Sequence, residues 1–250
     1  MNLSTKHEFL YKLKLNGRQV LDLGCGDASY WIQVLDNNPE CQLFLYEPDR
    51  KVLDKAKNAL VGRNVTFLSE LDSLKDNTLD VITCFAVLEH VFNLNEFFEV
   101  LKRLLAKNGT AYINYDDGHF RNAMYLSRSR GFRIRNSLKT KLSFLWRILS
   151  WYSKYQKPIN ANGLNVLISK NELRIAGERY HSIDSLEIIS GSLSLAEREE
   201  IFPLAMKLEE FLNSKLSKNA VHGLRGHSEI FSICSSRTLT LVHTAKSLSD

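Results

Sequence analysis

The sequence predicts an α/β fold with a seven-stranded, mostly parallel sheet and helices on both faces. Short apolar runs rich in β-branched residues alternate with helical patterns through the first half of the chain. The 250 residues suffice for one well-buried domain with an appendage. A composition of 44% hydrophobic and 24% charged residues is ordinary for a globular chain, which excludes general disorder and fibrous repeats.

The first half supplies five of the strands and three of the helices. Apolar runs predict the strands at Arg18–Leu23, Gln42–Tyr46, Asn64–Leu68, Leu79–Phe85 and Thr110–Tyr115. The helices are predicted at Ala28–Asn37, Asp49–Leu60 and Leu94–Leu105. Pro39 cannot continue the first helix, Asp49 is a suitable N-cap for the second, and Asn108-Gly109 closes the third.

The second half is predicted to complete the sheet after a helical insert. Strands are expected at Glu178–Ile189 and Ser228–Cys234, and helices at His119–Ser129, Ser137–Tyr155, Ser169–Gly177 and Ala196–Lys218. The predicted organisation is a core over residues 1–115, a basic helical lid over 116–168, the C-terminal part of the core over 169–236 and a frayed tail over 237–250.

Positive charge is concentrated in one segment. Residues 118–170 hold eleven Lys or Arg and no Asp or Glu, whereas the whole chain has 33 basic and 28 acidic side chains. The rest of the chain is therefore mildly acidic, and this segment is where an acidic partner would dock. The alternative is a solvated helical face that acids of the body neutralise.

The expected compartment is the cytoplasm. The first residues show no apolar run and no cleavage pattern typical of a secretory signal, and no apolar stretch is long enough to span a bilayer. The four cysteines Cys25, Cys41, Cys84 and Cys234 lie far apart without metal-ligand spacing. Reduced thiols are expected, with neither a zinc site nor a disulfide framework.

A glycine loop and an acid point to a nucleoside ligand. Gly24 and Gly26 lie where the first strand turns into the first helix, so the backbone can approach a ligand closely. Glu47 ends the second strand, where a carboxylate can accept both hydroxyl hydrogens of a ribose. Ser29 takes the position of the last glycine in a G-x-G-x-x-G motif, which weakens a nicotinamide-dinucleotide reading. A plain tight turn and a helix cap remain as alternatives.

The sequence resembles the class I S-adenosylmethionine-dependent methyltransferases, in particular those that act on small molecules. The resemblance rests on LDLGCGDAS, YEPD, LDVITCFAVLEHV, LKRLLAKNGTAYI and ELRIAGERY. It covers residues 18–115 and, more weakly, 165–235. The fold that it implies is Rossmann-like, and the cofactor is S-adenosyl-L-methionine.

The resemblance implies a role for each residue of the cofactor site. The glycine loop would hold the methionine part of the cofactor, Glu47 the ribose hydroxyls and Glu70 the adenine amino group. The full cofactor-binding set is Asp22, Gly24, Cys25, Gly26, Glu47, Pro48, Glu70 and Phe85. Two positions depart from the family pattern: Ala28 replaces a common third glycine, and NYDDGHF lacks the usual proline after strand five.

Methyl transfer asks mainly for in-line positioning of the acceptor, because a sulfonium methyl is already activated. A hydroxyl acceptor would benefit from a general base, and His90 and His119 are the candidates at the carboxyl edge of the sheet. His90 would alternatively line the pocket without moving a proton. Cys84 is expected to be a buried core residue, and Asp116-Asp117 lacks a further ligand, so no metal is predicted.

The basic insert would lie above the substrate side as a lid. Arg121, Arg133, Arg135 and Trp151 are the predicted substrate-binding residues, offering positive charge and an apolar wall. The expected acceptor is small or lipid-like and anionic, and is methylated at oxygen. A peripheral contact of the basic insert with a membrane is a further expectation. Nucleic acid is a weaker candidate, because neither an appended binding module nor an NPPY-like motif is present. An RNA methyltransferase and a catalytically silent nucleotide-binding protein remain the alternatives.

Overall fold

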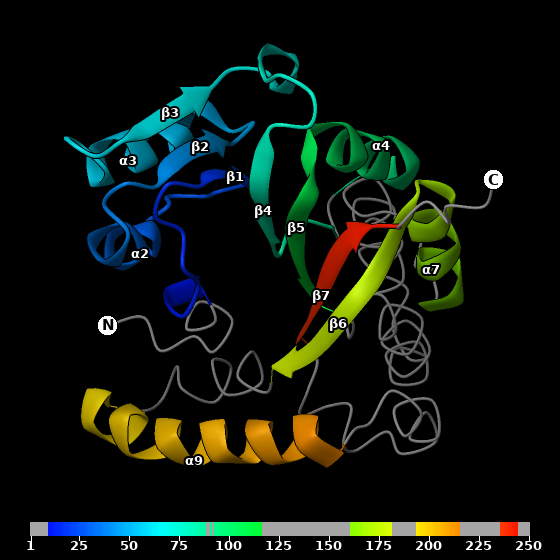
Figure 1. Ribbon diagram of the computed structural model, residues 1–250. Helices are drawn as coiled ribbons and strands as arrows, with labels where there is room; N and C mark the ends of the chain where they lie inside the picture. Colours follow the sequence, from blue (N-terminus) through cyan, green and yellow to red (C-terminus); the bar gives the residue numbers. More distant parts are fainter. Residues whose placement is uncertain are drawn as a thin grey trace, which may run out of the picture.

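The computed structural model of the chain describes residues 10–88, 91, 93–116, 161–181, 194–215 and 236–244 (Figure 1). Seven strands form one sheet in the order β3-β2-β1-β4-β5-β7-β6. The strands are β1 Gln19–Leu23, β2 Gln42–Tyr46, β3 Val65–Leu68, β4 Leu79–Phe85, β5 Leu105–Asp116, β6 Leu173–His181 and β7 Ser236–His243. The first five run parallel, and β7 runs antiparallel to both of its neighbours. The seven-stranded, mostly parallel sheet is therefore confirmed.

Helices cover both faces of the sheet, because each face carries its own apolar cluster (Figure 1). The helices are α2 Trp31–Asn37, α3 Arg50–Ala59, α4 Leu94–Leu104, α7 Ala161–Lys170 and α9 Leu195–Lys215, with a 3-10 turn η1 at Leu71–Ser73. Trp31 of α2 and Ala56 of α3 pack in one cluster, whereas Phe98 of α4 and Ile168 of α7 pack in the other. No described helix is long and apolar enough to cross a membrane.

The predictions for the first four strands and for the helices between them are confirmed with small shifts of their ends. Asp49 caps α3 as expected, because its carboxylate accepts from the backbone N–H groups of Lys51 and Val52. The third predicted helix, however, ends at Leu104, and β5 begins at Leu105. Gly109 is not its cap but lies in the irregular start of β5, where an added Cβ would come within 2.8 Å of the Leu79 carbonyl oxygen.

The predicted helix at Ser169–Gly177 is wrong. The helix α7 ends at Lys170, where Asn171 closes it by donating its side-chain N–H to the Leu167 carbonyl. From Leu173 the chain is strand β6, and Gly177 takes up a register shift against β7. Gly177 therefore does not end a helix but lies at an irregularity of the strand pairing.

The predicted tail is also wrong in part. Ser236–His243 forms β7, which lies between β5 and β6 rather than fraying. The prediction of α9 is confirmed, with the helix at Leu195–Lys215. Several predicted elements lie outside the described residues, namely the helices at 119–129 and 137–155, the strand at 228–234 and the part of the sixth strand from 182 to 189.

Candidate functional site

The carboxyl ends of β1, β2 and β3 lie side by side. Leu23 is in register with Tyr46, and Tyr46 is in register with Leu68. The residues that follow this row are Gly24, Glu47 and Ser69, and β4 lies on the other side of β1, where the strand order reverses. Open α/β sheets bind ligands at such a point. The glycine loop and the predicted ribose acid are therefore brought together, as the sequence predicted.

The two glycines of the loop have different surroundings. Gly24 has φ +75°, and an added Cβ would come within 2.4 Å of Val87 Cγ2, so the loop after β4 packs directly on it. The N–H of Gly24 donates to the Tyr46 carbonyl at 2.8 Å. Gly26 has φ +57°, and an added Cβ would meet no atom within 4 Å. Gly24 is thus required by packing, whereas Gly26 borders open space that a ligand can use.

Ala28, at the position of the third glycine in the family pattern, has a backbone conformation that favours glycine. Its φ is +53°, in the left-handed region, and its side chain is fully buried. Its N–H donates to the Cys25 carbonyl at 3.0 Å, which closes the loop before α2. The substitution changes the residue and keeps the turn, at the cost of local strain.

Glu47 is held by backbone N–H groups on both sides. One carboxylate oxygen accepts from Gly26 N at 3.1 Å and the other from Asp49 N at 3.0 Å. The side chain is half-buried. Because each carboxylate oxygen has two lone pairs, one acceptor position on each remains for two hydroxyl groups. The geometry suits the ribose role implied by the resemblance.

Asp22, which the resemblance includes in the cofactor site, is fully buried beneath the glycine loop. Its carboxylate is fully buried and accepts hydrogen bonds from Trp31 Nε1 at 2.8 Å, from Thr83 Oγ1 at 2.7 Å and from the Tyr30 hydroxyl. Burial raises the pKa of Asp22 above its ordinary value, although these donors oppose the shift. The side chain joins β1, β4 and the start of α2 beneath the glycine loop, which makes it a positioning group.

The other predicted cofactor residues surround this loop. Cys25 is buried, and burial raises the pKa of its thiol well above the ordinary range, which disfavours the thiolate form. Phe85 is buried at the end of β4, whereas Pro48 and Glu70 are exposed after β2 and β3. Cys84 is fully buried, which confirms the prediction of a core thiol.

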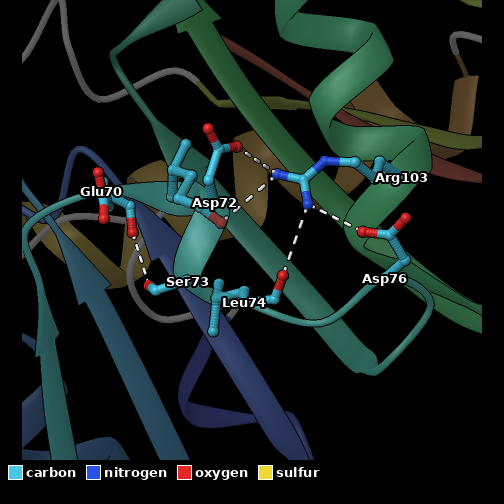
Figure 2. Close-up of polar contacts among 7 residues, drawn as sticks. Glu70, Asp72, Ser73, Leu74, Asp76 and Arg103 are labelled. Carbon is cyan, nitrogen blue, oxygen red and sulfur yellow. Dashed lines mark hydrogen bonds and ion pairs between the residues drawn. The ribbon is translucent and has the colours of Figure 1, made fainter.

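The segment after β3 is tied to α4 by a single arginine (Figure 2). The guanidinium of Arg103 contacts the Asp72 carboxylate at 3.1 Å and the Asp76 carboxylate at 2.9 Å. Glu70 lies immediately before the turn η1, and its carbonyl accepts from the Ser73 hydroxyl at 2.8 Å. Glu70, the residue predicted to bind the adenine amino group, therefore precedes a segment that Arg103 holds in place.

A polar cluster that the sequence analysis missed lies at the same edge of the sheet, at the ends of β5, β6 and β7. His181 Nε2 and Thr238 Oγ1 are 2.7 Å apart, and Thr238 also accepts from Asn114 Nδ2 at 3.1 Å. Fully buried Glu209 of α9 lies 3.3 Å from His181 Nδ1 and accepts from the Arg179 guanidinium at 3.2 Å. The helix α9 thereby crosses the edge at which β6 ends (Figure 1). These residues are distant in sequence, and no local sequence motif predicts that they form a cluster.

The remaining predicted site residues cannot be placed. His90, His119, Arg121, Arg133, Arg135 and Trp151 lie outside the described residues. Within the described part of the chain, no group of three or more His, Cys, Asp or Glu side chains could hold a metal ion.

Comparison with known proteins identifies the family. A family model described as a methyltransferase domain matches residues 2–154. A search of the curated proteins finds no match. The chain is 18% identical to a phosphoethanolamine N-methyltransferase 2 from Haemonchus contortus solved with S-adenosyl-L-methionine, with a TM-score of 0.57, over 95% of this chain and 52% of that one. It thus spans about half the length of that enzyme.

Two further structures share the fold over most of their own length. The chain is 12% identical to an S-adenosylmethionine-dependent methyltransferase from Mesorhizobium loti, with a TM-score of 0.56, over 94% of this chain and 95% of that one. It is 14% identical to a cyclopropane synthase from Mycobacterium tuberculosis, with a TM-score of 0.57, over 94% and 82%. Together with the family match, the strand order and the glycine loop, these similarities confirm the predicted class: the chain belongs to the methyltransferase-domain family and has the fold of the class I S-adenosylmethionine-dependent methyltransferases.

Proposed function

We propose that this S-adenosylmethionine-dependent methyltransferase transfers its methyl group to a small or lipid-like, anionic acceptor, at an oxygen atom. The observation that carries the proposal is the basic segment 118–170, which holds eleven Lys or Arg and no acid in an otherwise acidic chain. In this fold the segment follows β5, whose carboxyl end lies at the ligand edge of the sheet. An anion at that edge would find its counter-charge there.

The cofactor fits the residues present at the edge of β1 and β2. Open space at Gly26 leaves room for a ligand against the backbone, and Glu47 has acceptor positions for two ribose hydroxyls. Asp22 holds β1, β4 and the start of α2 together beneath this space. When bound, the cofactor supplies a methyl group that is already activated by its positive sulfur.

The protein's own contribution is to orient the acceptor and exclude water. A carboxylate or phosphate oxygen needs no proton removed before it attacks, so positive side chains that hold the anion in line would suffice. A hydroxyl acceptor would need a base, for which His90 and His119 stay the candidates.

Structures with the same fold support an acceptor of this kind. The Haemonchus contortus enzyme was also solved with phosphomonomethylethanolamine, a small anionic molecule, at 17% identity and a TM-score of 0.57. The cyclopropane synthase fold is shared as well. The first of these favours a second candidate, methylation of the amine nitrogen of a phosphorylated small molecule. Both candidates require an anionic group on the acceptor.

The first experiment is a calorimetric titration of the purified chain with S-adenosylmethionine and, in parallel, with NAD. Binding of the former alone is expected. Acceptor turnover is then followed by formation of S-adenosylhomocysteine, with matched pairs: phosphoethanolamine against ethanolamine, and a fatty acid against the corresponding fatty alcohol. Faster turnover of the anionic member of a pair supports the proposal, and the product identifies oxygen or nitrogen as the methylated atom.

Charge-reversal variants distinguish the effect of positive charge in the basic segment 118–170 from the effect of charge elsewhere on the chain. Arg133→Glu with Arg135→Glu should lower turnover of an anionic acceptor at least tenfold and leave cofactor affinity unchanged, because each arginine removed weakens a charge-assisted contact. The matched control is Lys55→Glu with Lys107→Glu, two exposed lysines elsewhere with the same total change of charge. Equal turnover by both double variants would contradict the proposal. Methylation of RNA, with binding that falls steeply with salt, would replace it by the nucleic-acid alternative.

A further inference from the structure

The segment between β3 and β4 has little structure of its own. Its only regular element is the single turn η1 at Leu71–Ser73. Two hydrogen bonds close that turn, from Ser73 Oγ to the Glu70 carbonyl and from Leu74 N to the Leu71 carbonyl. Hydrogen-bond geometry in a 3-10 turn is poorer than in an α-helix, so contacts from outside the turn contribute to its position.

Arg103, in the last turn of α4, supplies those contacts (Figure 2). Its guanidinium contacts the carboxylates of Asp72 and Asp76, and it points at the carbonyl oxygens of Leu71 at 3.4 Å and Leu74 at 3.5 Å. The backbone carbonyl of Arg103 accepts from Asn77 N at 2.8 Å. One residue thus touches the segment at five points from its first turn to its end.

These contacts matter more for position than for stability. The side chains of Asp72 and Asp76 are 92% and 59% exposed, and exposed ion pairs contribute little to the free energy of folding. A guanidinium, however, presents its donors in a rigid planar fork, so it fixes the distance between the acceptors that it joins. Lysine has a single ammonium and cannot join the same set.

Glu70 takes its direction from this anchored segment. It is extended, with φ −151° and ψ 152°, and it directly precedes the turn that Arg103 holds. Leu68, two residues earlier, is buried at the end of β3 and in register with Tyr46 of β2. The backbone at Glu70 is therefore fixed on one side by the sheet and on the other by the Arg103 contacts.

We propose that Arg103 is a positioning residue for the base of the cofactor: by holding the segment Leu71–Asn77 it keeps the Glu70 carboxylate aimed at the 6-amino group of adenine. The proposal rests on the cofactor assignment of the preceding subsection. It gives Arg103 a role in base selectivity, because a carboxylate accepts from a 6-amino group and opposes a 6-oxo group.

The test compares two ligands that differ only at this group, S-adenosylhomocysteine and its deaminated analogue S-inosylhomocysteine. Dissociation constants are measured by calorimetry for the wild type and for Arg103→Met, Arg103→Lys, Glu70→Gln and the double variant Arg103→Met with Glu70→Gln. The wild type should prefer the amino ligand. Arg103→Met and Glu70→Gln should each reduce that preference about five- to tenfold, because the first lets the carboxylate move away from the amino group and the second replaces the charged acceptor by an amide that can also donate to a 6-oxo group.

Two results distinguish positioning from general support of the fold. In the double variant, Arg103→Met should add nothing to the effect of Glu70→Gln, because the arginine acts through that carboxylate. Arg63→Met is the matched control: Arg63 bridges to Asp36 and the Ile32 carbonyl with 26% of its side chain exposed, against 30% for Arg103, and it precedes β3 at the opposite edge of the sheet. The variant Arg63→Met should lower the melting temperature by about as much as Arg103→Met does, and it should leave the preference for the amino ligand unchanged.

Three outcomes overturn the inference. A preference in Arg103→Met equal to that of the wild type would make Arg103 a structural residue only, while the cofactor assignment would stand. Independent, multiplying effects of the two single variants would show that Arg103 does not act through Glu70. Failure of the wild type to bind either ligand would remove the cofactor assignment and this proposal with it.

Discussion

The two halves of the carboxyl edge of the sheet, at β1, β2 and β4 and at β5, β6 and β7, are held together by different kinds of contact. Around β1 and β2, the groups that border the ligand space are held by backbone N–H groups of residues close in sequence, such as Gly26 with Glu47, 21 positions apart. Around β5, β6 and β7, they are made between side chains far apart, such as Asn114 with Thr238, 124 positions apart. The cofactor side depends on backbone conformation, and the other side depends on which side chains happen to meet. We expect substitutions on the first side to change ligand affinity, together with stability where the residue is buried or tightly packed, and those on the second to change stability alone.

The largest effect is expected for Gly24→Ala. The added Cβ would meet Val87 at 2.4 Å in a backbone with φ +75°, so overpacking and left-handed strain add to about 3–5 kcal/mol of lost stability. Denaturant unfolding with and without S-adenosylhomocysteine measures it. Adding Val87→Ala should recover only the packing part. Full recovery would show that the conformation of Gly24 is of no importance.

Glu209→Ala tests the other side. Removing a buried carboxylate leaves the Arg179 guanidinium and His181 without their partner, which should cost about 2–3 kcal/mol in the free energy of unfolding. The dissociation constant for S-adenosylmethionine should not change. A variant of normal stability with weakened cofactor binding would break the distinction between the two sides.

Glu47→Ala should weaken cofactor binding by about 1–3 kcal/mol, because two ribose hydroxyls would lose their acceptor. Its stability should change less than its affinity, since the N–H groups of Gly26 and Asp49 become accessible to water. Calorimetric titration gives the affinity. An unchanged dissociation constant would refute the ribose assignment.

Asp22→Asn addresses pH dependence. The pKa of Asp22 is raised in the folded protein, mainly by burial, from an ordinary value of 3.8, so the folded state holds this proton more tightly than the unfolded state. The contribution of Asp22 to stability therefore falls as the pH rises from about 3.8 through the raised pKa, and stays constant above it. Thermal unfolding across this range should show the decline in the wild type and lose that part of it in the variant. Identical profiles would mean that Asp22 does not titrate there.

Ala28→Gly should have the smallest effect. Relief of left-handed strain is offset by the greater freedom of glycine in the unfolded chain and by the loss of a buried methyl group, so stability should change by less than about 1 kcal/mol. Cofactor affinity should stay within twofold. A large change in affinity would show that the methyl group, rather than the turn, shapes the loop.

The difference between contacts made close in sequence and contacts made far apart also explains which features the sequence predicts. The strands β1 to β4 are short runs rich in apolar and β-branched residues, and the glycine loop with Glu47 follows from strand and helix lengths, so the sequence predicts both. The sequence predicts a helix for the first part of β6, up to Gly177, because this glycine resembles a helix end, whereas the strand predicted from Glu178 agrees with the second part. Only the pairing with β7 shows that Gly177 takes up a register shift. The cluster of His181, Thr238 and Glu209 has no local signal at all, because its members meet only in the folded chain.

The position of β7 has a consequence for how the molecule is assembled. In the described sheet, β6 touches the other strands only through β7, which comes later in the chain. The contact between His181 of β6 and Thr238 of β7, 57 residues further on, can therefore form only after β7 has been synthesised. The parallel strands β1 to β5 can pair before β7 is available, whereas β6 joins their sheet only through β7. We therefore expect this long-range pairing to be a slow part of folding, because closing a longer loop costs more entropy.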